Sequence, residues 1–130
     1  MLILLVLTLG ATNETKIEKL LTSIERVESA GRGSLTPDGD RGRSVGPYQI
    51  SKAYYRDSGI SILSEYRRVR DRAFARRVVL AYWARYERQA LRSVNAEALA
   101  RCHNGGWNWR KKIKATDAYW RRVEKEMRKR

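Results

Sequence analysis

Glu28 is the residue of this sequence best placed for acid catalysis, because it stands among apolar side chains. On a helical wheel it falls inside the apolar stripe of a predicted helix over residues 16–29, whereas Glu18 and Glu25 fall at the border of that stripe. Apolar neighbours and the negative end of the helix dipole disfavour a charged carboxylate. We therefore expect Glu28 to be protonated or readily protonated near neutral pH, as a general acid must be. The structural alternative is that Glu28 bonds an arginine or caps a loop amide.

Two further acids, Asp38 and Asp40, stand in the segment GRGSLTPDGDRGRSVGPYQI at residues 31–50, which has five glycines. A turn in this segment would bring them back towards Glu28. A carboxylic acid and a carboxylate facing each other across a groove are what glycosidic cleavage needs: the acid protonates the leaving oxygen, and the carboxylate supports the oxocarbenium-like carbon or activates water. We expect residues 31–50 to form the floor of such a groove. The separation of the two acids, which decides retention or inversion, is left open.

Five more residues are candidates for lining a saccharide groove: Tyr48, Gln49, His103, Asn104 and Trp107. Aromatic faces can stack on sugar rings and amides can bind N-acetyl groups, although tyrosine and tryptophan serve as core residues at least as often. A nucleophilic dyad of Cys102 and His103 is not expected, since adjacent helical residues point in different directions. The single cysteine and the absence of zinc-type Cys/His spacing argue against a metal site, and no cofactor is expected.

Helices must position most of these residues. Apolar periodicity predicts five of them, over residues 16–29, 52–58, 65–89, 96–103 and 117–130. Ser51, Asn95 and Thr116 are the expected caps of three of them. A loop and β-hairpin are expected over residues 31–46, around the turn Pro37-Asp38-Gly39. The fold class expected is therefore α+β, a mostly helical domain with a small β-hairpin or sheet near its amino-terminal third.

The charge of the chain is strongly positive, with 28 Lys and Arg against 14 Asp and Glu, a formal net charge of +14. Such a surface favours a polyanionic partner, and the anionic polymers of a bacterial cell envelope are one class. A basic nucleic-acid-binding module with aromatic residues among its cations is the rival reading. That reading explains the charge but leaves Glu28 and the two aspartates unexplained, so nucleic acid is not the partner we expect.

The first eleven residues, MLILLVLTLGA, form an apolar segment that is too short to span a bilayer stably. It has the character of a secretory signal, without the usual positive start. We expect a signal-like segment over residues 1–11, a single domain over residues 12–130, and a secreted or periplasmic protein. A buried strand or a helix start is the alternative for the segment.

Four motifs, in order, resemble the invertebrate-type (destabilase-like) lysozymes. They are IERVES at the end of the first predicted helix, the aspartate-bearing segment with GPYQI, the later HNGG, and DAYWRRV. The match covers roughly residues 20–60 and 96–123. Two departures stand out: animal members are rich in cysteine, and the Gly-Gly turn is followed here by Trp107-Asn108-Trp109. The chain therefore looks like a bacterial or phage relative, held by its core rather than by disulfides.

The resemblance implies a lysozyme-like fold and a bacteriolytic muramidase, a glycoside hydrolase that cuts the β-1,4 bond between N-acetylmuramic acid and N-acetylglucosamine in peptidoglycan. By that resemblance Glu28 is the general acid and Asp40 the second carboxylate, with Asp38 as the competitor. A lytic transglycosylase is the alternative, because it needs only the one glutamate.

Overall fold

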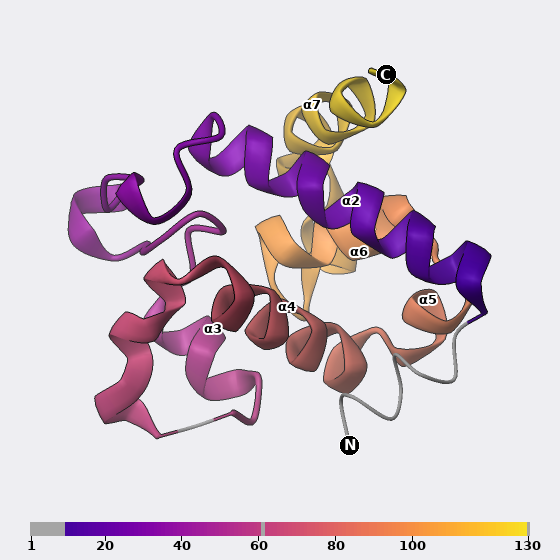
Figure 1. The fold of residues 1–130 in the computed structure, drawn as a ribbon. Coiled ribbons are helices and arrows are strands. Elements are labelled where there is room, and N and C mark those ends of the chain that lie inside the picture. The colour runs from indigo at the N-terminus through magenta and orange to yellow at the C-terminus, as the bar shows by residue number, and fades with distance from the viewer. Residues whose placement is uncertain (1–9, 61, 130) are drawn as a thin grey trace.

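The first described element is a long helix that crosses one face of the molecule. The computed structural model describes residues 10–60 and 62–129, and within them α2 spans Ala11–Ser29 (Figure 1). It ends where Ala30 turns left-handed, at φ 52°, and donates its N–H to the carbonyl of Arg26. The stripe expected from the sequence is buried, at Ile17, Leu20, Leu21 and Ile24.

Helix α2 begins at Ala11, five residues before the start predicted from the sequence. The apolar segment predicted over residues 1–11 lies outside the described residues, apart from Gly10 and Ala11. Among the helices of the described part, none has the length and apolar character needed to cross a membrane.

The β-hairpin predicted over residues 31–46 is wrong, because this part of the chain forms turns instead of strands. Two short 3-10 helices occur there, η1 (Gly33–Leu35) and η2 (Asp40–Gly42). In the described ranges the only β pairing consists of two isolated antiparallel bridges, which join Gly39 to Ser44 and Val45 to Ile50. The fold is thus mostly helical, as expected, but without the small sheet.

Left-handed backbone in both loops explains why no strand ladder grows. Asp40, Arg41 and Gly42 have φ values of 49°, 57° and 83°, and in the second loop Gly46 and Gln49 have φ values of 79° and 50°. Residues in this region curl the chain, whereas a ladder needs consecutive extended residues. Each bridge therefore closes a four-residue loop, and the pairing does not extend into a strand ladder.

The rest of the described chain is helical. Its elements are α3 (Lys52–Asp57), η3 (Leu63–Arg70), α4 (Arg72–Tyr86), α5 (Arg88–Ser93), α6 (Ala96–Gly105), η4 (Trp109–Thr116) and α7 (Asp117–Arg128). The predicted caps Ser51 and Asn95 are confirmed, since each side chain accepts a backbone N–H of its helix. Thr116 stands at the start of α7 but does not cap it, and its hydroxyl donates to the Ile113 carbonyl.

The single long helix predicted over residues 65–89 is wrong, because two acidic residues divide it. Asp71 is extended, with ψ 128°, and its side chain caps α4 by accepting the N–H of Phe74. Glu87, with φ −137° and ψ 44°, separates α4 from α5. Aspartate competes well for an N-cap position, so an apolar period that continues across it does not guarantee one helix.

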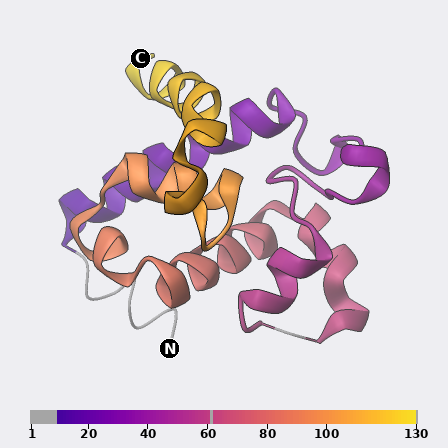
Figure 2. The same ribbon diagram turned by 180° about the vertical axis from the view of Figure 1, so that it is seen from behind.

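The core lies where α2, α4 and α6 meet. Seen from behind, α6 lies between α2 and α4, and it contacts both of them (Figure 2). Helix α7 contacts both α2 and α6. The largest fully buried side chains include Trp83 of α4, Leu99 of α6, and Tyr48 from the turn segment. This packing brings the end of α2 close to residues from the carboxyl-terminal third of the chain.

We predict that Gly46→Ala lowers the free energy of unfolding by about 3 kcal/mol, because it combines a left-handed φ with overpacking. A Cβ at this position would lie 2.2 Å from the carbonyl oxygen of Val69. Gly33→Ala is the matched control, since Gly33 is also left-handed but a Cβ there meets no atom within 4 Å. Urea denaturation of the two variants measures the difference, and equal losses would contradict the close approach.

Candidate active site

Glu28, in the last turn of α2, has its carboxylate against two side chains from the carboxyl-terminal third of the chain. Tyr119 of α7 donates its hydroxyl to Glu28 Oε2 at 3.1 Å, and Nε2 of His103 lies 3.3 Å from the same oxygen. Burial, helped by the Glu28 carboxylate, raises the pKa of Tyr119 well above its ordinary value, so its hydroxyl stays a donor. The side chain of Glu28 is 20% exposed. Its polar contacts within the described residues are thus a phenol and an imidazole.

The arginine pair considered for Glu28 from the sequence is not formed. Within the described part of the chain no arginine or lysine lies within ion-pair distance of its carboxylate, and Oε1 makes no hydrogen bond there. One carboxylate oxygen is thus held by protein groups, whereas the other has no such partner among the described residues.

His103 connects Glu28 to two tyrosines. The hydroxyl of Tyr54 lies 2.9 Å from Nδ1, and burial raises the pKa of Tyr54 well above its ordinary value, so the phenol keeps its proton. The Tyr48 carbonyl, 3.0 Å from Nε2, can only accept, so Nε2 carries a proton, and Glu28 lies 3.3 Å from the same nitrogen. The hydrogen positions are assigned from these partners. Nε2 of His103 is therefore a donor towards Glu28 in this arrangement.

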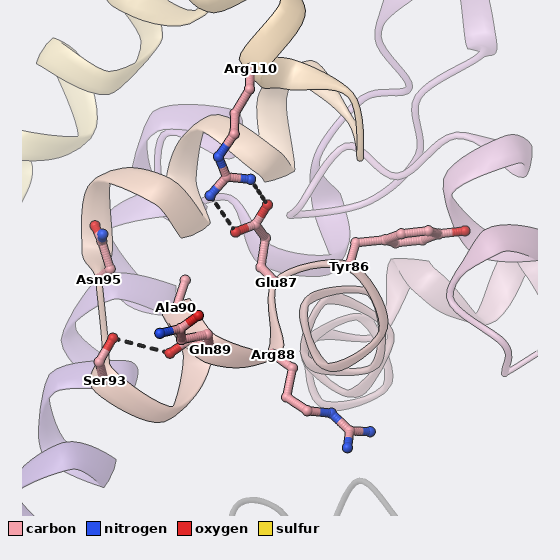
Figure 3. Close-up of a pocket in the computed structure, with 8 residues that line it drawn as sticks. All are labelled: Tyr86, Glu87, Arg88, Gln89, Ala90, Ser93, Asn95 and Arg110. Carbon is pink, nitrogen blue, oxygen red and sulfur yellow. Dashed lines mark hydrogen bonds and ion pairs between the residues drawn. The ribbon is translucent and has the colours of Figure 1, made fainter.

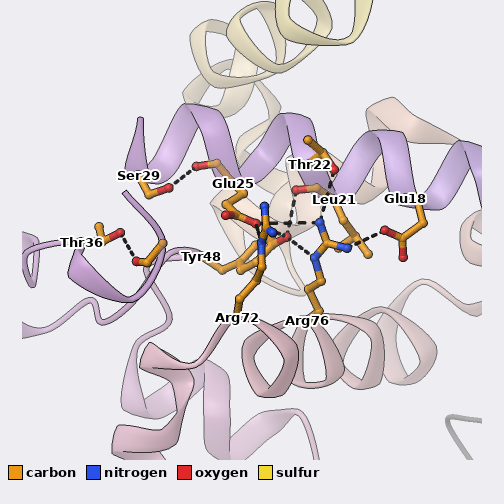
Figure 4. Close-up of polar contacts among 10 residues, drawn as sticks. Glu18, Leu21, Thr22, Glu25, Ser29, Thr36, Tyr48, Arg72 and Arg76 are labelled. Carbon is orange, nitrogen blue, oxygen red and sulfur yellow. Dashed lines mark hydrogen bonds and ion pairs between the residues drawn. The ribbon is translucent and has the colours of Figure 1, made fainter. Parts of the chain in front are cut away.

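Glu25 lies one turn before Glu28 and is the most buried acid of α2. Figure 4 shows it beside Tyr48, Arg72 and Arg76. Its carboxylate, 4% exposed, accepts Nε of Arg72 at 2.7 Å and the hydroxyl of Tyr48 at 3.1 Å. Arg76 donates its Nε to the same hydroxyl at 2.8 Å. These four residues, the Glu25 cluster, join α2 to α4 and to the turn that carries Tyr48. The sequence signal for it was the pair of arginines four residues apart at the start of α4, which share one face.

Two of the five predicted saccharide contacts have internal roles. Tyr48 is fully buried and presents no ring face to a surface ligand, contrary to the sequence expectation. Gln49 is half-buried, and its amide donates to the carbonyls of Pro37 and Gly46 at 3.3 and 2.9 Å. Gln49 therefore ties the second loop to the segment just before the first one.

The other three predicted contacts lie on or just after α6. His103 is buried against Glu28, as described above, whereas Asn104 and Trp107 are exposed. The structure thus brings Glu28 and His103 together and leaves Asn104 and Trp107 on the surface that follows them. The contact from Tyr119 was missed, although the residue lies in a motif quoted from the sequence, because 91 residues separate it from Glu28.

The two aspartates of the turn segment differ in their partners. Asp38 is paired with Arg70 at 2.9 Å and Arg67 at 3.5 Å. Asp40 is exposed, left-handed at φ 49°, and makes no hydrogen bond or ion pair through its side chain with another described residue. No direct contact joins Asp40 to Glu28. Of the two acids, Asp40 is the one whose carboxylate is available to a ligand.

A cavity of about 400 Å³ lies away from these residues, around the start of α5 (Figure 3). It is lined by Tyr86, Glu87, Arg88, Gln89, Ala90, Ser93, Asn95 and Arg110. At its edge the buried Glu87 is held by two nitrogens of Arg110 and by the indole N–H of Trp109. This carboxylate is fully engaged in holding α5 to η4, so the cavity offers no free catalytic acid.

Cys102 takes no part in nucleophilic chemistry in this fold. It is fully buried, and burial raises the pKa of its thiol to about 12, so it stays protonated at neutral pH. In residues 10–60 and 62–129 no three His, Cys, Asp or Glu side chains gather where they could hold a metal ion.

We predict that Glu25→Gln lowers the free energy of unfolding by about 2 kcal/mol, because it removes the charge that the two arginines of the Glu25 cluster face. The loss is smaller than for a fully buried pair, since Arg72 is 57% exposed. Glu65→Gln, which breaks an exposed pair with Arg68, is the control and should cost about 0.5 kcal/mol or less. Urea denaturation of both variants measures these values; a Glu25→Gln variant as stable as the control would show that the cluster contributes little.

Comparison with known proteins agrees with the motifs. The sequence is 38% identical over 81 residues, 62% of this chain, to Lysozyme 1 from Crassostrea virginica. The chain spans 44% of the length of that protein. No family model and no solved structure matches the sequence of this chain. The similarity confirms the resemblance to an invertebrate lysozyme that the sequence motifs predict.

Proposed function

We propose that this protein is a lysozyme-type glycoside hydrolase that cleaves the β-1,4 bond between N-acetylmuramic acid and N-acetylglucosamine in peptidoglycan. The observation that carries the proposal is the arrangement of Glu28, held through one oxygen by Tyr119 and His103 and without a cationic partner among the described residues. The similarity to a protein named lysozyme supports the same reaction class.

Glu28 acts as the general acid. Because Oε2 faces two donors, a proton on this carboxyl group resides on Oε1, the oxygen without a protein partner. Oε1 gives that proton to the glycosidic oxygen as the bond from this oxygen to the anomeric carbon breaks. Tyr119 and His103 fix the orientation of the carboxyl group, so that little freedom is lost when the substrate binds.

Asp40 is the second carboxylate of the proposal. It stabilises the oxocarbenium-like carbon or activates the water that adds to it. Asp38 is a weaker choice, because Arg67 and Arg70 already hold its carboxylate. The left-handed backbone of η2 sets the direction in which Asp40 is presented.

The positive charge of the chain serves the same function. A net charge of +14 attracts the protein to peptidoglycan and to the other anionic polymers of the envelope, and this attraction weakens as salt is added. The proposal places the protein where the wall is, outside the cytoplasmic membrane.

A lytic transglycosylase is the second candidate, favoured by one observation. No hydrogen bond or ion pair links Asp40 to the group of side chains around Glu28, and internal attack by a substrate hydroxyl needs Glu28 alone as acid and base. The products separate the two reactions, since a transglycosylase leaves 1,6-anhydro ends.

We predict that Glu28→Gln reduces the rate of cell-wall clearing by a factor of about 10² to 10⁴, the usual contribution of a general acid. Glutamine keeps the size of the side chain and an acceptor for Tyr119, so the fold is retained. The matched control is Glu18→Gln, an exposed glutamate on the same helix, which should clear walls at the normal rate. Turbidity measurements give the clearing rates, and circular dichroism checks that both variants are folded. Normal clearing by Glu28→Gln would contradict the proposed enzymatic activity.

We predict that Asp40→Asn reduces clearing at least tenfold, while Asp38→Asn keeps activity wherever it remains folded. Mass spectrometry of the digested wall should show reducing ends for the unmodified protein. An active Asp40→Asn variant whose products carry 1,6-anhydro ends would replace the hydrolase with the transglycosylase.

A further inference from the structure

Trp107 is the one tryptophan that the fold leaves largely exposed. All four tryptophans lie in the described ranges; Trp83 and Trp109 are buried and Trp120 is half-buried, whereas Trp107 is 55% exposed. Burying such a side chain stabilises a protein by several kcal/mol at most sites. A lone exposed apolar side chain is ordinary, so what matters is how the rest of the structure holds this one.

The backbone at Trp107 is held in a defined place. Its N–H donates to the hydroxyl of Tyr82 at 2.9 Å. The two preceding glycines are both required: a Cβ on Gly105 would lie within 3 Å of Thr116 and Trp109, and Gly106 has φ 88°. The exposed indole therefore follows a turn whose conformation requires glycine at both preceding positions.

The ring of Trp107 is supported from one side by Tyr86. The two rings are nearly parallel, at 28°, with centroids 6.4 Å apart, as in an offset stack. Arg85 lies against Tyr86, with its guanidinium carbon 5.2 Å from the ring centroid. Although Tyr86 packs on one side of it, Trp107 remains 55% exposed.

A continuous row of aromatic rings connects Trp107 to Glu28. Tyr86 packs on Tyr82 at 4.8 Å, Tyr82 stacks on Tyr54 at 3.9 Å and 9°, and Tyr54 bonds His103. His103 in turn lies beside Glu28. Trp107 thus marks the outer end of an aromatic row whose inner end lies beside the proposed acid, and it stands only four positions after His103 in the chain.

We propose that Trp107, backed by Tyr86, is a stacking subsite for a hexosamine ring of the glycan strand, outside the two sugars whose bond is cut. This inference rests on the proposed function, because it takes its ligand from the same polymer. A pyranose ring carries a face of C–H groups that packs on an aromatic ring, while its hydroxyl and N-acetyl groups stay hydrated or bond polar neighbours such as the exposed Asn104. Binding at a distance from the reacting bond helps to hold a long substrate in place.

The test measures binding separately from cleavage, in the Glu28→Gln protein. Titration calorimetry compares a peptide-free glycan hexasaccharide from peptidoglycan with its disaccharide. Trp107→Ala should weaken hexasaccharide binding five- to tenfold and leave disaccharide binding unchanged, and Trp107→Phe should restore most of the loss. Ile113→Ala is the matched control, because Ile113 is apolar and 46% exposed in the neighbouring η4; it should bind both sugars normally.

Fluorescence gives a second readout that does not depend on the variants. Because Trp107 is the most exposed indole, the hexasaccharide should protect it from acrylamide quenching. Equal hexasaccharide binding by Trp107→Ala, or unchanged quenching in saturating hexasaccharide, would overturn the subsite. Protection by a single-stranded oligonucleotide but not by the sugar would overturn it in favour of a base-stacking surface. Normal wall clearing by Glu28→Gln would count against the proposed hydrolase alone, since these measurements involve no cleavage.

Discussion

The buried carboxylate of Glu25 is the constraint on which the geometry of the site depends. A charge in the interior is costly unless charged and hydrogen-bonding groups surround it, and here Arg72, Arg76 and the hydroxyl of Tyr48 do so. That requirement ties α2 to α4 and seats Tyr48, whose carbonyl faces His103. Through these contacts, a group that takes no part in the proposed chemistry determines what surrounds Glu28 one turn later.

Arginines in this protein serve two separate purposes. Some join separate elements: Arg101 is buried and bonds Asp117 at 2.6 Å, which joins α6 to α7, and the exposed Arg110 holds the buried Glu87 at the end of α4. Many others are exposed and contribute to the positive surface. A count of charges in the sequence does not distinguish the two groups, because pairing depends on which acid the fold brings near.

Aromatic side chains show the same division between support and surface. Tyr54, Tyr82 and Tyr86 are packed on one another, and the row ends in the exposed Trp107. From the sequence alone, a single aromatic residue is equally compatible with a place in the core and with a contact to a ligand. Burial separates the roles, since Tyr48 is enclosed and Trp107 is not.

Local patterns in the sequence were enough to predict the apolar stripe of α2, the caps at Ser51 and Asn95, and the resemblance to invertebrate lysozymes, because each depends on residues close in the chain. They did not predict the turns that replace the hairpin or the break at Asp71, where left-handed backbone and capping outweigh periodicity. Only the tertiary structure decided that Glu25 is the acid that forms a buried ion pair, and that Tyr119 and His103 contact Glu28. The physical reason is that these contacts join helices far apart in the chain, and helix packing, not spacing along the chain, sets which side chains meet.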